Sequence, residues 1–413
     1  MPAAHDSLKT RLLLTFNANR FAWIMAIVFI CFGVMEIING RFWLSDLEVD
    51  YRAAANLLNG QAVYGRTGGA GSGLFKYSPF TLLCIAPYAL MPFGAVKIIH
   101  FCFVGAMIIC SMIYMERFIS ETFFGNQKSA GTKILFLSVL VAGIHLNREL
   151  HIGNWNVHLL FLAVFALHLI TGKKEWAGGA VLAWVVLMKP HFVILIPLLL
   201  MRKKGKALAG FFVGIFAGLI LPSLFLGIRR NIEFHAAWVN TMLTHNTSFF
   251  RDEGCIYSLG YKFGLKYLFP EAGILYASAM VACVAFLVFI LVTNDLRREH
   301  SRQGTQDETK SNFVFEYFLL LAILPSITVT DTEHYLWSLP IIIFIMTYWV
   351  YGAKKRNWLF FATIVSFLLY GGNIYDLLGR DLSRYLEEAG IYGMGNILII
   401  LSSLVIFNRR RIS

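Results

Sequence analysis

Residues 21–38 read FAWIMAIVFICFGVMEII, and this apolar run decides the class of fold. As a helix it is long enough to cross a hydrocarbon core about 30 Å thick. The run follows a polar stretch with Lys9, Arg11 and Arg20, and it lacks the small-residue cleavage site of a secretory signal. We therefore expect a retained, membrane-spanning first helix.

The composition of the whole chain also indicates a lipid environment. Of 413 residues, 57% are hydrophobic and only 15% are charged, and the mean hydropathy is +0.64. A soluble chain of this length could not bury so much apolar surface in one core. The formal charge of +12 comes from short basic clusters between apolar runs. This pattern is typical of positive-inside membrane topology and argues against nucleic acid as a partner.

The basic clusters predict the topology. All of them can face the cytoplasm, with both termini inside, if the chain crosses the membrane about twelve times. The predicted spans are roughly 21–40, 94–116, 133–147, 156–172, 176–189, 190–201, 207–227, 272–294, 313–327, 336–352, 357–373 and 393–408. The Lys189-Pro190 break leaves a re-entrant hairpin open for 176–201. Segment 77–92 is apolar but interrupted by three prolines, so we expect it to be interfacial or re-entrant.

Residues 1–413 are predicted to form a single all-α membrane domain, because no soluble domain and no internal repeat is evident. Its first outer loop covers about 41–93, and an inner loop covers about 295–311. The six cysteines show neither metal-ligand spacing nor a disulfide framework. Acids, amides, a lysine and histidines gather in the loops of the predicted outer face, which is expected of an enzyme that works at that surface. The outer stretches are 41–76, 148–156, 228–271, 328–335 and 374–392.

An ordered set of motifs resembles glycosyltransferase family 87. The motifs are Asp46-Leu47-Glu48-Val49-Asp50-Tyr51-Arg52, Tyr77-Ser78-Pro79-Phe80, Gly153-Asn154-Trp155-Asn156, Leu187-Met188-Lys189-Pro190 and Glu333-His334-Tyr335. Together they span most of the chain in the order of the family. The sequence departs from the family pattern at a few positions. Asn154 replaces the usual Gln, Asp50 replaces a common aromatic residue, and Asp331 and Glu333 stand where Trp and His are frequent.

The resemblance implies a GT-C-type fold with interfacial helices in the first outer loop. It also implies an inverting transfer of a sugar from a polyprenyl-phosphate donor to a lipid or glycan acceptor. Mannose is the expected sugar, and arabinose is an alternative. The expected location is the cell membrane, specifically a bacterial inner membrane, with the active site on the non-cytoplasmic face. Membrane lipids are expected partners, nucleic acid is not, and the oligomeric state is left open.

Two residues are predicted to carry the chemistry. The acceptor hydroxyl must lose a proton as it attacks, and a carboxylate is a natural base for this step. Asp46 matches the catalytic aspartate of the family, although Ser45-Asp46 also fits a helix N-cap. His334 matches the family histidine, which would stabilise the departing lipid phosphate. A hydrogen-bonded interfacial histidine without a catalytic role is the alternative for His334.

The remaining candidates would bind substrate. Lys189 lies between apolar runs, where a cation is costly unless it is paired or faces a cavity, so phosphate contact and pairing with a carboxylate both remain open. Arg148 is a second candidate for the phosphate. Asn154 and Asn156 could hold sugar hydroxyls or satisfy loose backbone at a helix break. On the resemblance, Tyr77, Asp331 and Glu333 complete the expected substrate-binding set.

No cofactor is expected, although a divalent ion is left open. The inner loops lack an Asp-x-Asp motif for nucleotide sugars, and the glycine-rich run 68–73 has no strand before it. We interpret that run as a flexible flap. A multispanning transporter or flippase of a lipid-linked substrate is the main alternative, and a polysaccharide ligase or polymerase is another. A transporter usually carries ionisable residues near mid-bilayer, whereas here they favour one surface.

Overall fold

The computed structural model describes residues 2–67, 73–125, 131–244, 282–291, 293, 306–328, 331–351 and 358–412. Every regular element among these residues is a helix, apart from one isolated antiparallel bridge between Thr67 and Leu74. The prediction of an all-α chain is therefore confirmed. Residues 68–72 of the glycine-rich run, the long outer loop beyond Thr244 and most of the predicted inner loop lie outside the described residues.

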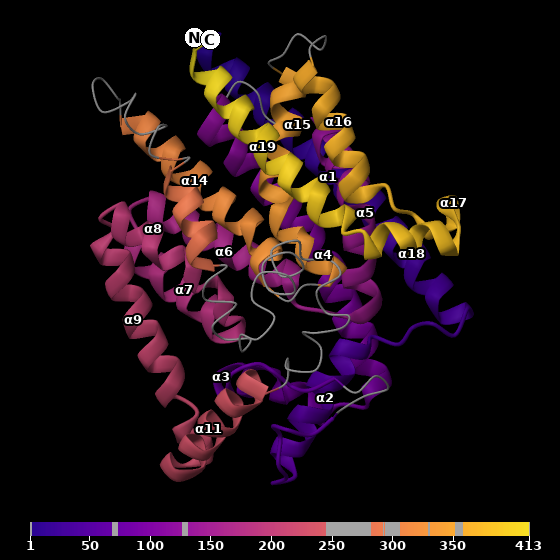
Figure 1. Ribbon diagram of the computed structural model, residues 1–413, viewed down its shortest axis with the longest axis vertical. Coiled ribbons are helices and arrows are strands. Elements are labelled where there is room, and N and C mark those ends of the chain that lie inside the picture. The colour runs from indigo at the N-terminus through magenta and orange to yellow at the C-terminus, as the bar shows by residue number, and fades with distance from the viewer. Residues whose placement is uncertain are drawn as a thin grey trace.

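The first part of the chain runs from α1 to α11. Its elements are α1 (Pro2–Ile38), α2 (Ser45–Leu58), α3 (Pro79–Ile85), η1 (Ala86–Leu90), α4 (Phe93–Ile119), η2 (Ser120–Phe124), α5 (Thr132–Ile152), α6 (Asn156–Thr171), α7 (Glu175–Met188), η3 (Pro190–Ile194), α8 (Leu195–Met201), α9 (Gly205–Ile220), α10 (Ser223–Leu226) and α11 (Ile228–Thr244). Figure 1 shows most of these helices gathered in one bundle, with α2, α3 and α11 at one end of it.

The second part of the chain completes the bundle. A short helix covers Ala282–Leu291, and it is followed by α14 (Gln306–Ile327), η5 (Thr332–Ser338), α15 (Leu339–Tyr351), α16 (Trp358–Gly371), α17 (Tyr375–Leu378), α18 (Arg380–Glu388) and α19 (Ile391–Ile412). The two chain termini lie at the same end of the bundle, opposite α2, α3 and α11 (Figure 1).

Among the residues that the structure describes, seven helical stretches are long and apolar enough to cross a membrane. They are Asn19–Ile38, Phe93–Phe124, Thr132–Ile152, Gly205–Leu226, Glu308–Ile327, Thr332–Tyr351 and Ile391–Arg409. The other predicted crossings overlap shorter apolar helices, namely Asn156–Thr171, Glu175–Met188, Pro190–Met201, Ala282–Leu291 and Trp358–Gly371. Residues 272–281 of the predicted crossing 272–294 lie outside the described residues. The structure thus describes a membrane protein with seven candidate spans, and the count of about twelve crossings stays a prediction.

Exposed apolar side chains identify the lipid-facing surface of the bundle. On α1, the side chains of Trp23, Ile27, Ile30, Val34 and Ile38 follow one another at helical spacing and are exposed. A continuous apolar stripe of this kind is unfavourable in water but favourable against lipid tails. The opposite side of α1, with Phe21 and Met25, is buried in the main core. The apolar run that opens the sequence therefore has one face in the protein and one available to lipid.

Contacts between helix ends agree with the predicted alternation of sides. At the predicted outer end, Glu36 Oε2 lies 2.6 Å from His151 Nδ1 and joins α1 to α5. At the predicted inner end, the Gly131 N–H donates to the Tyr351 hydroxyl over 2.8 Å. There the Lys204 ammonium also lies 2.8 Å from a Glu175 carboxylate oxygen. Helix ends that the topology assigns to one side thus meet in space.

The proline-rich segment 77–92 forms the short helices α3 and η1, which contact α2. Ser78 caps α3 by accepting a hydrogen bond from the Thr81 N–H over 3.3 Å, and Pro79 takes the first helical position. Apolar residues of α2, α3 and α11 share a second, smaller core. Helices α2, α3 and α11 are too short to span a bilayer, and together they form a platform at the predicted outer end. The place of α3 and η1 in this platform is the one expected for an interfacial segment 77–92.

Glycines hold α7 and α9 in close contact. A Cβ at Gly179 would lie 1.8 Å from the Ala207 carbonyl oxygen, and one at Gly210 would lie 2.0 Å from the Trp176 carbonyl oxygen. Larger residues would therefore force the two backbones apart, which is the usual reason for small residues between membrane helices. The tight α7–α9 pair fixes the position of Lys189, which directly follows α7.

Candidate active site

Four helix ends bring the predicted site residues together. Asp46 stands in the first turn of α2, and Asn154 and Asn156 belong to the turn between α5 and α6. Lys189 occupies the break between α7 and η3, and residues 331–334 begin η5. These segments are far apart in the sequence, and the side-chain contacts described below join them into one polar cluster.

Gly153 explains the sharp turn that aims Asn154 at α2. It ends α5 with φ of +69°, a left-handed conformation that favours glycine. A Cβ at this position would lie 3.0 Å from the Leu44 side chain and 3.2 Å from that of Leu47. His100 Nε2 lies 3.0 Å from the Gly153 carbonyl oxygen and anchors the turn. The close approach of this turn to α2 therefore requires glycine.

Asp46 is bound to the turn through Asn154. The Asn154 amide donates to Asp46 Oδ2 over 2.7 Å and lies 3.5 Å from Glu333 Oε1. Burial raises the pKa of Asp46 to about 6, the Glu333 carboxylate acts in the same direction, and Lys189 opposes them. The carboxylate is therefore a stronger base than an ordinary aspartate and is still mostly ionised at neutral pH.

Lys189 is buried in the same cluster. Its backbone is extended, as expected before Pro190, and this breaks the helix and turns the side chain inward. Nζ donates to Asn156 Oδ1 over 2.6 Å and lies 3.3 Å from His334 Nε2. The Asn156 amide in turn donates to Glu149 Oε2 over 3.1 Å. The lysine therefore sits among an amide, an imidazole and a nearby carboxylate, and not in an apolar environment.

Both ring nitrogens of His334 have polar neighbours. Asp331 caps η5, and its backbone N–H donates to His334 Nδ1 over 3.2 Å. The same nitrogen lies 3.2 Å from Glu333 Oε1. The Lys189 ammonium lies 3.3 Å from Nε2. In the tautomer with the proton on Nδ1, Nε2 accepts from Lys189. In the tautomer with the proton on Nε2, both groups are donors, and an anionic oxygen would satisfy both.

Arg148 is held by two carboxylates. Its Nη2 donates to Asp331 Oδ2 over 3.3 Å, and its Nε lies 4.0 Å from Glu333 Oε2. Glu333 is buried, and its Oε2 receives no hydrogen bond within the part of the chain that the structure describes. Arg148 therefore neutralises charge at the start of η5, while Glu333 keeps one oxygen available to a further donor.

Tyr77 and Asp50 line the α2 side of the cluster. The Tyr64 hydroxyl donates to the Tyr77 carbonyl oxygen over 2.9 Å, and burial raises the pKa of the Tyr77 phenol, to which Asp50 and Asp46 both contribute. Asp50 Oδ2 accepts from Trp155 Nε1 over 2.7 Å, and burial raises the pKa of Asp50 well above its usual value. Asp50 is therefore held by an indole and is less exposed than Asp46, which is only partly buried.

The sequence did not single out two residues that belong to this cluster. Lys76 is exposed and lies within electrostatic range of Asp46, Lys189 and Glu333. The sequence feature that could have indicated Lys76 is its position, as a cation, directly before the Tyr77-Ser78-Pro79 motif. Glu149 is buried in the last turn of α5 and accepts hydrogen bonds from the Asn156 amide and the Val157 N–H. In the sequence, Glu149 lies in the predicted outer stretch 148–156, close to the end of a predicted span, where an acid usually has a partner.

No group of three or more His, Cys, Asp or Glu side chains in the described ranges could hold a metal ion. The polar cluster described above instead combines carboxylates with amide, ammonium, guanidinium and imidazole nitrogens. Such a set can move a proton and bind an oxyanion.

The model of glycosyltransferase family 87 matches residues 75–306, just over half of the chain. This range includes five predicted site residues: Tyr77, Arg148, Asn154, Asn156 and Lys189. Asp46 lies before the matched range, and Asp331, Glu333 and His334 lie after it. No curated protein and no solved structure is detectably similar to the chain.

Proposed function

Because the chain belongs to glycosyltransferase family 87, we propose that this membrane glycosyltransferase uses a polyprenyl-phosphate sugar as donor. The proposed sugar is mannose and the proposed acceptor is a lipid or a glycan. One observation carries the proposal: a raised-pKa aspartate and a lysine–histidine pair belong to one network of polar contacts, joined through Asn154 and Glu333.

Asp46 is the proposed base. The acceptor hydroxyl gives its proton to Asp46 while its oxygen forms a bond to the anomeric carbon of the donor. The bond between that carbon and the phosphate oxygen breaks, and the electron pair leaves with the polyprenyl phosphate. Because the acceptor attacks from the side opposite the phosphate, the anomeric configuration inverts. Asn154 orients the carboxylate by donating to its Oδ2.

The lysine–histidine pair is the proposed phosphate site. The Lys189 ammonium and His334 Nε2 stand 3.3 Å apart. In the proposed donor-bound state His334 carries its proton on Nε2, so that both groups are donors. A phosphate oxygen between them would accept from both and would become more strongly bound as it gains charge in the transition state. The donor pair therefore supports a lipid phosphate as leaving group without requiring a nucleotide.

Glu333 is the proposed contact for a sugar hydroxyl. Its buried Oε2 lacks a hydrogen-bond donor among the residues described, and a sugar hydroxyl could supply one. Arg148 lies between Glu333 and Asp331, the residue that caps η5, and Arg148 is therefore proposed as a positioning residue. Asn156 is proposed to hold the Lys189 ammonium in place, and Tyr77 to line the acceptor side.

The site is proposed to face the non-cytoplasmic side of the cell membrane, with both termini in the cytoplasm. The positive-inside distribution supports this orientation. Cysteine variants in a background free of reactive native cysteines test it with a membrane-impermeant label applied to intact cells. We expect Glu48→Cys to react from outside and Lys204→Cys to react only after permeabilisation. The reverse pattern would overturn the proposed orientation.

A donor panel tests the proposed reaction. Membranes that contain the full chain are incubated with radiolabelled polyprenyl-phosphate mannose, arabinose or glucose, and separately with the corresponding nucleotide sugars. We expect label to enter a lipid or glycan product from a polyprenyl-phosphate sugar, with mannose the most active. Membranes with Asp46→Asn should be inactive. Transfer from a nucleotide sugar when polyprenyl-phosphate synthesis is blocked would overturn the proposed donor class.

A further inference from the structure

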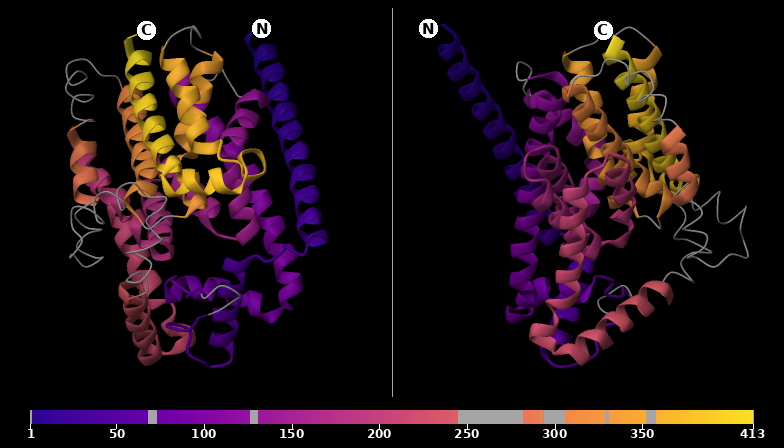
Figure 2. Two further views of the ribbon diagram at one scale, coloured as in Figure 1. Left: turned by 45° about the vertical axis from the view of Figure 1, so that its right-hand side comes forward. Right: turned by 90° about the vertical axis from the view of Figure 1, so that its left-hand side faces the viewer.

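The apolar surface of α9 continues around a corner onto α11. On α9 the exposed side chains include Phe212, Phe216 and Ile220, which belong to a candidate membrane span. The exposed side chains of Leu224 and Phe225 follow on α10, and α11 continues with exposed apolar residues of its own. Figure 2 shows α11 turning away from α9 and running across the end of the molecule. The lipid-facing surface of a membrane span therefore leads directly onto a helix that does not continue the span.

Helix α11 has three distinct flanks. Ile228, Ile232, Val239 and Leu243 are exposed and lie on one flank at helical spacing. A second flank packs against the smaller core through Phe234, Ala237 and Trp238, and Trp238 Nε1 donates to the Lys76 carbonyl oxygen over 2.8 Å. The third flank is polar and carries Arg229, Glu233 and Asn240. An amphipathic helix at a membrane surface shows this combination, with lipid on one flank and water on another.

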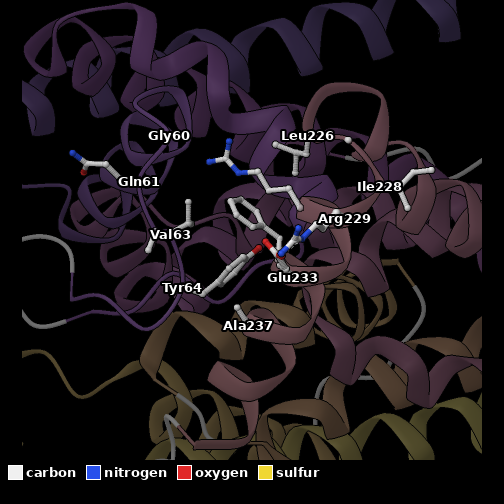
Figure 3. Close-up of a pocket in the computed structure, with 13 residues that line it drawn as sticks. Gly60, Gln61, Val63, Tyr64, Leu226, Ile228, Arg229, Glu233 and Ala237 are labelled. Carbon is white, nitrogen blue, oxygen red and sulfur yellow. Dashed lines mark hydrogen bonds and ion pairs between the residues drawn. The ribbon is translucent and has the colours of Figure 1, made fainter.

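A cavity of about 570 Å³ lies beside the start of α11. Figure 3 shows it between the 60–64 segment that follows α2 and the first turns of α11. Arg229 and Arg230 line it together with Glu233, and Tyr64 and Phe234 provide aromatic walls. The positive end of the α11 helix dipole faces the same space. Asp46, Lys189 and His334 do not line this cavity, so it is separate from the polar cluster.

We propose that this cavity binds the phosphate headgroup of an anionic phospholipid in the outer leaflet, with the acyl chains along the exposed apolar surface of α9 and α10. The charge favours a lipid phosphate, because the two arginines exceed the single glutamate by one positive charge. The continuous apolar surface from α9 favours a lipid over a soluble phosphate, since only a lipid fills both features. This inference does not depend on the sugar donor or the acceptor.

Hydrogen exchange of the full chain in nanodiscs tests the proposal. The bilayers contain either phosphatidylcholine alone or phosphatidylcholine with phosphatidylglycerol, and a third sample adds glycerol 1-phosphate to phosphatidylcholine discs. An arginine near an anionic surface contributes roughly fivefold to lipid affinity. We therefore expect peptides from 228–244 to exchange at least about fivefold more slowly with phosphatidylglycerol present, and we expect no protection from glycerol 1-phosphate.

Variants separate the headgroup site from general surface charge. The double variant Arg229→Gln/Arg230→Gln should lose the protection by phosphatidylglycerol. The matched control Arg384→Gln should keep it, because Arg384 is also exposed and paired at i,i+4, with Glu388, but lies away from the cavity. Exchange in α19 reports whether each variant is folded. Equal protection by both lipids, protection by glycerol 1-phosphate, or protection that persists in the folded double variant would overturn the proposal.

Discussion

The polar cluster at the helix ends and the cavity beside α11 both contain charged residues, but they hold them differently. In the cluster, Asn154, Lys189 and Glu333 are 4%, 8% and 2% exposed, and each lies within reach of side chains from other helices. Beside α11, the Arg229 side chain is 94% exposed and pairs with Glu233 one turn away on the same helix. The cluster therefore depends on the whole fold, whereas the α11 pair depends only on its helix.

This difference predicts how strongly each region responds to mutation. A buried charge that loses its partner is costly, because neither water nor another group replaces the contact. An exposed pair loses little, because water solvates both charges. Substitutions in the cluster should therefore change catalysis by orders of magnitude, whereas substitutions on α11 should barely change the stability of the protein.

The largest effect is expected for Asp46→Asn. The amide keeps the shape of the side chain and can still contact Asn154, but it cannot accept the acceptor's proton. Loss of a general base typically lowers the rate by about 10²–10⁴-fold. The initial rate of label transfer from polyprenyl-phosphate sugar measures this loss. Glu48→Gln is the matched control, because Glu48 lies on the same helix and pairs with Arg52 at 2.5 Å. An equal loss in both variants would remove the special role of Asp46.

Lys189→Met should have the second largest effect. The variant removes the ammonium that faces His334 and leaves an apolar side chain of similar length. Loss of one donor to a developing oxyanion typically lowers kcat by about 10²–10³-fold. Because this contact should strengthen in the transition state, kcat should fall more than the donor KM rises. Steady-state kinetics over donor concentration separates the two. A variant with normal kcat and a raised donor KM would indicate ground-state binding only.

The pH dependence of transfer should report Asp46. The base must be ionised to accept a proton, and its pKa lies at about 6. The rate should therefore be nearly constant above pH 7 and fall about tenfold per unit below pH 6. Asn154→Asp would place a third carboxylate beside Asp46 and Glu333. Repulsion among the three carboxylates should raise the pH below which the transfer rate falls by on the order of one unit. If the rate of that variant fell at the same pH as the rate of the unmodified protein, a group other than Asp46 would control the pH dependence.

Hydropathy and the basic clusters predicted much of the fold, because lipid and water select residues locally along the chain. Each predicted span overlaps an apolar helix of the described residues, and the segment interrupted by three prolines is two short helices. The platform role of α11 could not be predicted. Its inward flank, with Phe234 and Trp238, is recognisable only once α2 and α3 are in place to pack against it.

The candidate site, like the fold, could be predicted only in part. Motif residues such as Asn154 and Lys189 were found because the family pattern marks them, and the structure brings them together. Their functional roles stay predictions. Lys76 directly precedes the Tyr77-Ser78-Pro79 motif, but it was missed because an exposed lysine before a motif is most often simply solvated. The pairing of Arg148 with Asp331 and Glu333 joins residues that are distant in sequence, so periodicity could not indicate it.

The smallest effect is expected for the Arg229–Glu233 pair. The two side chains are one helical turn apart, 3.1 Å from each other, and largely in water. A double-mutant cycle with Arg229→Ala, Glu233→Ala and the double variant should give a coupling of about 0.3–0.5 kcal/mol in the free energy of unfolding. The measurement belongs in a neutral detergent, where no anionic lipid contributes.

The buried Arg202–Glu316 pair, with contacts of 2.7 and 2.5 Å, provides the contrast. Removing Arg202 should destabilise the protein by roughly 3 kcal/mol, because two donors leave a buried carboxylate. A coupling above about 1.5 kcal/mol on α11 would show that this pair is structural, and the contrast between the two regions would then fail.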